Sequence, residues 1–267
     1  MNVLDLFSGI GGFSLGLEST GFFKTIAFVE KDKFCQKVLQ KNFPNIPIED
    51  EVRNVKGERF KADVITGGFP CQPFSVAGKR RGTDDDRFLW DETIRIVSEQ
   101  KPKWFIGENV EGIINIQDGM VFRQIHDDLE SEGFEVQSLV IPASSTGAFH
   151  QRKRVWIIGC NVSNTQRNKH QHSTIRKSRE NKIWGFHTAE KKQTTHDIRS
   201  KTSRCDGISG KTESWWEAQS NFCGVPNGVS YELDKDRANR IKSLGNSIVP
   251  QIAREIGKAI IEAETNV

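Results

Sequence analysis

The segment Gly67–Ser75 contains the cysteine whose surroundings are best suited to covalent chemistry. Its sequence is Gly-Gly-Phe-Pro-Cys-Gln-Pro-Phe-Ser, and it follows an apolar run that predicts a strand. Pro70 and Pro73 restrict the backbone on either side of Cys71, so the thiol is expected on a stiff turn. An isolated cysteine would favour a buried structural role, but the position of Cys71 between prolines at a strand end favours a nucleophile.

A basic stretch follows Cys71 and ends near Trp90. It contains Lys79, Arg80 and Arg81 beside glycine residues. A free thiol has a pKa of about 8.5 and reacts as the thiolate, so positive charge near Cys71 would promote its ionisation. The stretch is also typical of a catalytic loop that closes over a substrate.

A glycine-rich turn near the amino terminus could approach a small ligand closely. Asp5–Phe13 predicts a strand, a tight turn and the start of a helix. Glycine permits positive φ, and a helix N-terminus offers N–H groups to an anionic group such as a carboxylate. The spacing is G-x-G-G, which differs from the G-x-G-x-x-G of dinucleotide-binding proteins. A purely structural turn is the alternative interpretation.

Acidic residues after the next apolar runs could complete this ligand site. Glu30 follows the second predicted strand, where an acidic residue can bind ribose hydroxyls. An ordinary carboxylate at a helix start is the alternative for Glu30. Asp50 follows the apolar Ile46–Ile48 and is a candidate partner for an adenine amino group.

Two arginines occur at alternate positions of a later strand pattern. Arg152 and Arg154 lie in Gln151–Gly159, which predicts a strand, so both side chains should point to the same face. Guanidinium groups there would suit a carbonyl oxygen or a phosphate. An exposed strand face is the alternative.

Alternating strands and helices over residues 1–160 must position these groups. The predicted strands are Val3–Phe7, Thr25–Val29, Ala62–Thr66, Trp104–Gly107, Phe134–Ile141 and Val155–Gly159, and the predicted helices include Phe13–Ser19, Leu89–Val97 and Pro250–Glu264. This alternation predicts an α/β fold with a doubly wound, mostly parallel sheet. Ligands of such sheets bind beyond the carboxyl ends of the strands. The residues expected there, because each follows a strand, are Glu30, Gly67, Cys71 and Glu108.

The composition changes after Cys160. Ser163–Trp216 contains 12 Lys or Arg against 5 Asp or Glu, although the net charge of the chain is only +3. A basic segment of this kind indicates a nucleic-acid-binding region, and a solvated insert is the alternative. Its histidines and cysteines fit no standard zinc spacing, so we expect no metal.

Five motifs together resemble the DNA cytosine-C5 methyltransferase family, in its small bacterial or phage form. They are Asp5–Phe13, Gly67–Ser75, Glu108–Val110, Gln151–Arg154 and Gly245–Pro250. The resemblance implies the Rossmann-like fold of class I S-adenosylmethionine-dependent methyltransferases with a small, irregular target-recognition domain. It implies a catalytic and cofactor-binding domain over 1–162, a target-recognition region over 163–232, and a C-terminal segment, 233–267, that returns to the catalytic domain.

The resemblance also implies roles for individual residues. The catalytic residues would be Cys71, Glu108, Arg152 and Arg154. The residues that bind S-adenosylmethionine would be Phe7, Gly9, Gly11, Gly12, Glu30, Asp50, Pro70 and Asn246. The residues that bind DNA would be Gln72, Ser75, Lys79, Arg80, Arg81, Asn109 and Val110.

The implied reaction is methylation of C5 of a cytosine flipped out of duplex DNA at a specific sequence. The Cys71 thiolate would add to C6 and thereby make C5 nucleophilic. Glu108 would promote protonation of N3, so that negative charge does not build up on the ring. The implied setting is a restriction–modification system or phage self-protection, with a restriction endonuclease as a functional partner.

Composition limits where such a protein could act. There is no run of about 18 apolar residues, so no membrane span is expected. The amino terminus lacks the pattern of a signal peptide, and five scattered cysteines suit a reducing compartment. We expect a monomer in a prokaryotic cytoplasm, associated with the nucleoid.

Three other functions stay open. An RNA cytosine-C5 methyltransferase could use the same frame, although the Cys-Phe-Thr element of its tRNA-acting relatives is absent. A catalytically silent DNA-binding homologue is disfavoured by the presence of Cys71, Glu108 and Arg154. A Rossmann oxidoreductase is disfavoured by the G-x-G-G spacing.

Overall fold

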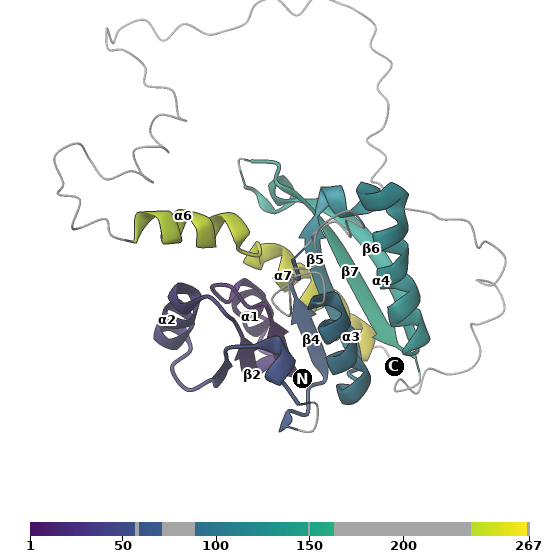
Figure 1. The fold of residues 1–267 in the computed structure, drawn as a ribbon, viewed down its shortest axis with the longest axis horizontal. Helices are drawn as coiled ribbons and strands as arrows, with labels where there is room; N and C mark the ends of the chain where they lie inside the picture. Colours follow the sequence, from purple (N-terminus) through teal and green to yellow (C-terminus); the bar gives the residue numbers. More distant parts are fainter. Residues whose placement is uncertain (57–58, 71–88, 149, 163–235, 266–267) are drawn as a thin grey trace, which may run out of the picture. The chain divides into compact units, whose positions relative to one another are not determined.

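The computed structural model describes residues 1–56, 59–70, 89–148, 150–162 and 236–265 (Figure 1). The chain divides into two units, Met1–Gly185 with Ser243–Val267, and Phe186–Lys242. The boundary falls inside helix α6 (Arg237–Asn246). The sheet and the described part of the candidate site belong to the first unit.

A seven-stranded sheet forms the centre of the first unit. Its strands are β1 (Asn2–Leu6), β2 (Lys24–Val29), β3 (Ile48–Glu49), β4 (Val64–Gly67), β5 (Trp104–Val110), β6 (Phe134–Pro142) and β7 (Lys153–Asn161). Their order is β3-β2-β1-β4-β5-β7-β6, and β7 is antiparallel to both of its neighbours. The other pairs are parallel, so the predicted α/β fold with a mostly parallel sheet is confirmed.

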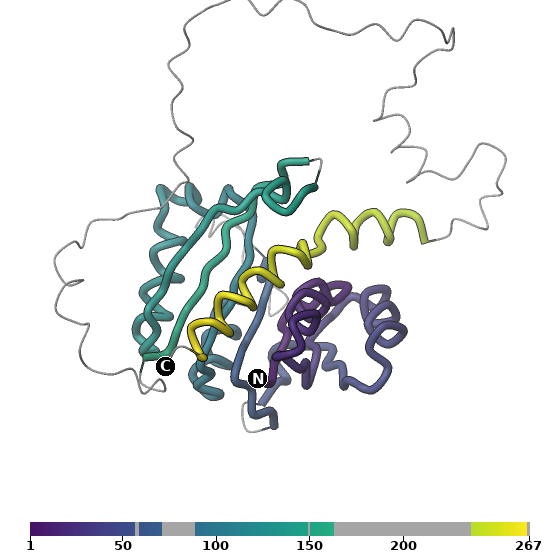
Figure 2. The backbone as a smooth tube through the Cα atoms, turned by 180° about the vertical axis from the view of Figure 1, so that it is seen from behind, coloured from purple at the N-terminus to yellow at the C-terminus, as the bar shows by residue number. Residues whose placement is uncertain are grey.

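Helices cover both faces of the sheet, as Figure 1 and Figure 2 show from opposite sides. Helices α1 (Gly12–Glu18) and α7 (Pro250–Thr265) pack on one face, and α3 (Leu89–Gln100) and α4 (Met120–Ser131) pack on the other. Alternate strand residues point to opposite faces. Val3 and Val64 therefore join the cluster of α1 and α7, whereas Leu4 and Ile65 join that of α3 and α4.

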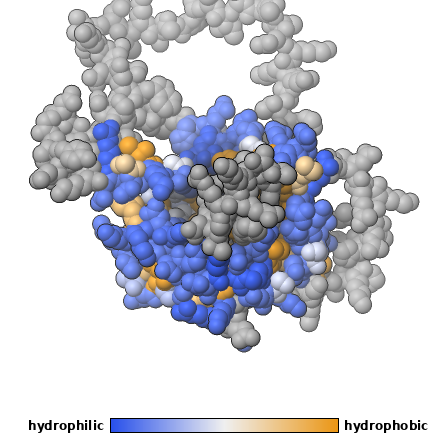
Figure 3. Space-filling view, viewed as in Figure 1, coloured by the Kyte–Doolittle hydropathy of each residue, from blue (hydrophilic) through white to orange (hydrophobic). Residues whose placement is uncertain are grey.

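The remaining described elements are short or peripheral. They are α2 (Lys33–Asn42) and the 3-10 helices Val52–Asn54, Glu111–Gly119 and Ala143–Thr146. On the face seen in Figure 3, the described surface is mainly hydrophilic, with small scattered hydrophobic groups. None of the helices in the part of the chain that the structure describes is long and apolar enough to cross a membrane.

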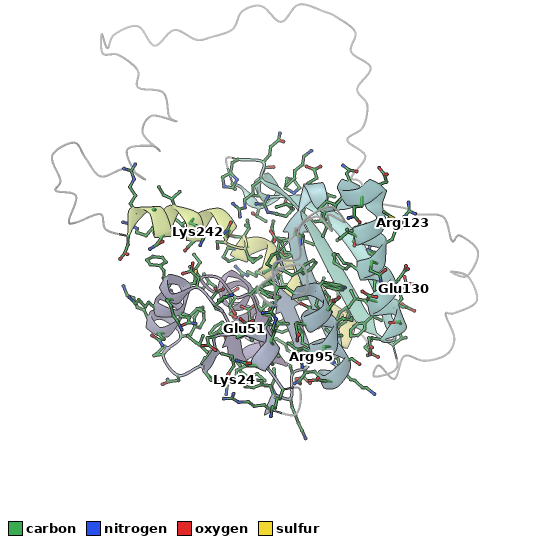
Figure 4. All side chains as sticks on the ribbon, in the orientation of Figure 1. Lys24, Glu51, Arg95, Arg123, Glu130 and Lys242 are labelled. Atoms are coloured by element: carbon green, nitrogen blue, oxygen red, sulfur yellow. The ribbon has the colours of Figure 1, made fainter. Side chains whose placement is uncertain are left out.

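Helix α4 has no counterpart among the sequence predictions, although its signal is present. Val121, Ile125 and Leu129 recur every four residues and are buried against the sheet. Arg123 and Glu130 lie on its exposed side (Figure 4). The helix is thus a regular amphipathic cover for the β6 edge of the sheet.

Candidate active site

Strand register aligns the ends of five parallel strands. Leu6 of β1 pairs with Val29 of β2 and with Gly67 of β4. Val29 pairs in turn with Glu49, and Gly67 with Gly107. The residues one step further along each strand direction are Asp50, Glu30, Phe7, Gly68 and Glu108. The carboxyl edge of the sheet therefore brings together candidate residues from distant parts of the sequence.

Glu108 lies at this edge of the sheet inside a strand, although it was expected to follow one. The prediction that Glu108 follows the end of a strand is wrong, because β5 continues to Val110. The extension is caused by β7, which pairs antiparallel with β5 as far as Val110 and Arg154. Glu108 is therefore held by strand pairing on a rigid element.

The glycine turn between β1 and α1 is braced by Glu30. The N–H of Gly9 donates to Glu30 Oε2 over 2.7 Å, and the N–H of Asp32 donates to Oε1, also over 2.7 Å. Burial raises the pKa of the Glu30 carboxyl, and these two hydrogen bonds oppose the rise. The turn uses positive φ at Phe7 (52°), Gly9 (55°) and Gly11 (86°).

Asp5 is a buried carboxyl beneath the glycine turn that the sequence predictions passed over. It is fully buried and accepts hydrogen bonds from Thr66 Oγ1 (2.6 Å) and Ser14 Oγ (3.2 Å). Burial raises its pKa to about 7, although the two hydroxyl groups lower it. Asp5 links β1, β4 and α1, and the sequence signal was an acidic residue inside an otherwise apolar strand.

The other expected cofactor residues follow or begin neighbouring elements of the fold. Asp50 is exposed directly after β3, and Pro70 is exposed three residues beyond β4. Gly12 begins α1, and Asn246 is the exposed last residue of α6. A Cβ at Gly9 would meet nothing within 4 Å, so the backbone there is open to a ligand.

Glu108 carries the most distinctive electrostatics of the described site. The residue is 9% exposed, and its Oε1 lies 3.0 Å from Arg154 Nε. Burial raises the pKa of Glu108 to about 7, whereas Arg154 and Arg152 act to lower it. A carboxyl group with this pKa can hold or release a proton near neutral pH.

Arg152 and Arg154 have different partners. The prediction of one strand over Gln151–Gly159 is wrong at its start, since β7 begins at Lys153 and Arg152 has a φ of 29°. Arg154 lies in the strand and reaches Glu108. Arg152 instead donates from Nη2 to the carbonyl oxygens of Gly245 (2.6 Å) and Ser247 (2.8 Å).

Asn109 connects β5 to the turn after β4. Its Nδ2 donates to the carbonyl oxygen of Phe69 over 2.9 Å, and its Oδ1 accepts from the N–H of Val110 over 2.9 Å. Asn109 is 3% exposed, whereas Val110 is 45% exposed. The Asn109 side chain therefore supports the turn, and Val110 is the more accessible of the two expected DNA contacts.

An aromatic cluster joins the two ends of the segment 71–88. The ring centroids of Phe69 and Trp90 are 4.9 Å apart, and those of Trp90 and Phe105 are 6.1 Å apart. The indole N–H of Trp90 donates to Asp128 Oδ2 over 2.7 Å. Phe69, which precedes this segment, and Trp90, which follows it, are therefore in direct contact.

Several predicted residues lie outside the described residues. They are Cys71, Gln72, Ser75, Lys79, Arg80 and Arg81, together with the expected target-recognition region 163–232. Within the ranges that are described, no group of three or more His, Cys, Asp or Glu side chains could hold a metal ion.

A family model described as C-5 cytosine-specific DNA methylase matches residues 1–223. Type II methyltransferase M.Bsp6I of Bacillus sp. (strain RFL6) is 39% identical over 163 residues, which cover 60% of this chain and 52% of the relative. Type II methyltransferase M.PspPI of Psychrobacter sp. (strain TA137) is 41% identical over 163 residues, covering 59% and 39%. The chain spans about half the length of the curated relatives it matches, or less.

Solved structures show the same fold. A putative DNA modification methyltransferase encoded within an E. coli prophage aligns with a TM-score of 0.53 and 31% identity, covering 61% of this chain and 47% of that one. A mutant of DNMT2 from Spodoptera frugiperda aligns with a TM-score of 0.55 and 25% identity, covering 63% and 52%. These similarities confirm the predicted class I methyltransferase fold.

Proposed function

Because the chain belongs to the C-5 cytosine-specific DNA methylase family, we propose that it transfers a methyl group from S-adenosylmethionine to C5 of a cytosine in duplex DNA. The observation that carries this proposal is the buried Glu108, whose carboxyl has a pKa of about 7 and contacts Arg154. Such a group can supply a proton to a ring nitrogen at neutral pH.

The residues around the glycine turn fit S-adenosylmethionine. Gly9 leaves an open backbone face, and carboxylates follow β2 and β3 at the same edge of the sheet. Glu30 accepts hydrogen bonds from the N–H groups of Gly9 and Asp32, and a carboxylate has about four acceptor sites, so it can also accept from a ribose hydroxyl. The residues that would hold the cofactor are Phe7, Gly9, Gly11, Gly12, Glu30, Asp50, Pro70 and Asn246. The cofactor supplies an electrophilic methyl group when it is bound.

Cys71 is the proposed nucleophile. Its thiolate adds to C6 of the cytosine, and the electron pair of the C5–C6 double bond makes C5 nucleophilic. Glu108 gives a proton to N3 during this addition, and Arg154 orients the carboxyl group and the neighbouring O2 of the base. After methylation, a water molecule takes the proton from C5, Cys71 leaves C6 as a thiolate, and N3 returns its proton to Glu108, which restores the aromatic ring.

The proposed contacts with DNA come from two parts of the sequence, the residues around Cys71 and the basic region 163–232. The base must leave the helical stack to reach Cys71, so base flipping is part of the proposal. Gln72, Ser75, Lys79, Arg80 and Arg81 would approach the flipped nucleotide, with Asn109 and Val110 shaping the pocket. The basic region 163–232 would bind phosphates and read base edges in the major groove.

The proposed biological role is modification of host or phage DNA. Relatives of this chain carry the name Type II methyltransferase, and one solved relative is encoded within a prophage. We propose a monomer that acts in a bacterial cytoplasm. A restriction endonuclease would recognise the same sequence without binding this protein.

Two linked experiments test the function. Bisulfite sequencing of DNA from cells that express the protein should reveal one methylated sequence context. A duplex with 5-fluorocytosine at that position should then form a denaturation-resistant complex with the protein, because fluorine cannot leave as a proton does. The complex should require S-adenosylmethionine and disappear in Cys71→Ser.

Other outcomes would contradict the proposal. Absence of methylation in the DNA would contradict the proposed activity. An equal yield of the adduct with Cys71→Ser would show that Cys71 is not the nucleophile. A parallel assay with tRNA tests the RNA alternative, since methylation of tRNA without methylation of duplex DNA would replace the proposed substrate.

A further inference from the structure

The segment Gly245–Pro250, here named the strap, runs from the last residues of α6 to the first residue of α7 and crosses the start of α1. A Cβ placed on Gly12 would lie 2.7 Å from the carbonyl oxygen of Ile248 and 2.9 Å from its Cβ. Only glycine therefore fits where the strap crosses the start of α1. The crossing fixes Ile248 against the backbone expected to bind the cofactor.

The Ile248 side chain also reaches the turn that leads to Cys71. A Cβ placed on Gly68 would lie 3.4 Å from Ile248 Cδ1 and 3.6 Å from Glu108 Oε2. Ile248 is 8% exposed. One apolar side chain thus lies between the glycine turn on β1 and the Gly68 turn on β4, close to the carboxyl group of Glu108.

Arg152 holds the strap on both sides of Asn246. Its Nη2 donates to the carbonyl oxygens of Gly245 and Ser247, at 2.6 and 2.8 Å. Its Nε is buried and has no hydrogen-bond partner within the described part of the chain. Arg152 has a positive φ and precedes the first residue of β7, whereas Arg154 lies within the strand.

We propose that Arg152 is a positioning residue that grips the strap and thereby keeps Ile248 as a spacer between the glycine turn and the Gly68 turn. The spacing matters because the methyl donor and the Cys71 nucleophile must meet on one cytosine ring, so the inference rests on the proposed function. Arg154 is then the arginine that contacts Glu108 directly and is proposed to touch the base, whereas Arg152 acts on Glu108 only as a nearby positive charge. A small displacement of the strap would separate the two turns without removing any reacting group.

Substitution of Arg152 by lysine tests the grip. Lysine keeps the charge but lacks the planar fork that serves two carbonyl groups. Loss of one charged hydrogen bond should weaken S-adenosylmethionine binding about 10-fold in the absence of DNA, measured by calorimetry. Hydrogen exchange at residues 247–253 should become faster. Lys153→Gln, which changes an exposed neighbouring cation, should leave both measurements unchanged.

Ile248→Val tests the spacer with little risk to folding. Valine removes Cδ1, the atom that faces Gly68. Ile252→Val is the matched control, because Ile252 is buried in the same cluster but lies on α7. Both variants should lose similar stability, whereas only Ile248→Val should lower kcat at saturating cofactor and DNA.

The results separate the positioning role from its alternatives. Unchanged cofactor affinity in Arg152→Lys, with weakened DNA binding, would overturn the grip and make Arg152 a DNA contact. Equal kcat values for Ile248→Val and Ile252→Val would overturn the spacer. Failure of the unaltered protein to bind S-adenosylmethionine would refute the proposed cofactor, and hydrogen exchange would still decide whether Arg152 holds the strap.

Discussion

Arg154 Nε lies 3.0 Å from Glu108 Oε1, and the two residues meet diagonally across adjacent strands. Arg154 pairs in register with Val110, two residues beyond Glu108, so both side chains share one face of the β5–β7 pair. The contact combines a buried carboxyl of raised pKa with a fixed cation. Its geometry is set by backbone pairing.

Removal of the Arg154 charge should move the pH dependence of the reaction. Arg154 lowers the pKa of Glu108, so Arg154→Gln should raise that pKa further above its present value of about 7. The limb of the kcat/KM profile that reports Glu108 should therefore shift to higher pH. Values of kcat/KM for DNA, measured between about pH 5.5 and 9, would show this shift of the Glu108 limb.

Lys153→Gln is the control for this shift, because it removes a cation one residue away that lies 3.9 Å from Glu111. It should leave the profile in place. If both limbs of the Arg154→Gln profile coincide with those of the unaltered protein, Glu108 is not the group that titrates.

Asn109→Asp should impair the covalent step more than cofactor binding. A carboxylate cannot donate to the carbonyl oxygen of Phe69, and the buried acceptor would be left unpaired. The cost should be about 1–3 kcal/mol, felt at the turn that leads to Cys71. The rate of adduct formation with 5-fluorocytosine DNA should fall while cofactor affinity is retained. An equal loss of adduct rate and of cofactor affinity would mean that Asn109 supports the whole site.

Asp5→Asn should flatten the pH dependence of stability. The pKa of Asp5 is raised from 3.8 to about 7, so the folded state binds a proton that the unfolded state releases. In the unaltered protein, this carboxyl lowers the free energy of unfolding by about 1.4 kcal/mol per pH unit across that window. The free energy of unfolding of the two proteins is compared by denaturant titrations at about pH 4.5, 6 and 7.5. If it changes with pH equally in both proteins, Asp5 is not a buried carboxyl that titrates in this range.

Trp90→Phe should separate anchoring of the Cys71 segment from general stability. Trp90 packs on Phe69 and donates to Asp128 over 2.7 Å. Trp104→Phe is a close control, since both indoles are 7% exposed and Trp104 donates to Glu264 over 2.8 Å. Each variant should lose about 1–3 kcal/mol in denaturant unfolding. Only Trp90→Phe should slow adduct formation, and equal adduct rates would count against the anchor.

Local patterns were sufficient for the fold class and the main elements. The apolar runs at Val3–Phe7 and Thr25–Val29 and the four-residue spacing of Ile252, Ile256 and Ile260 depend on neighbouring residues alone, so they predicted β1, β2 and α7. The glycine spacing of Asp5–Phe13 likewise predicted the turn. Such signals do not depend on which strands become neighbours.

Only the tertiary structure decided which candidate residues meet. The register of the parallel strands placed Glu30 and Glu108 at the same carboxyl edge of the sheet, although they are far apart in the chain. Pairing with β7 continued β5 through Glu108. The equal spacing of Arg152 and Arg154 concealed their separate partners, because the strand starts between them. A sequence pattern fixes the face of a residue within its own element, whereas pairing and packing between elements fix what that face contacts.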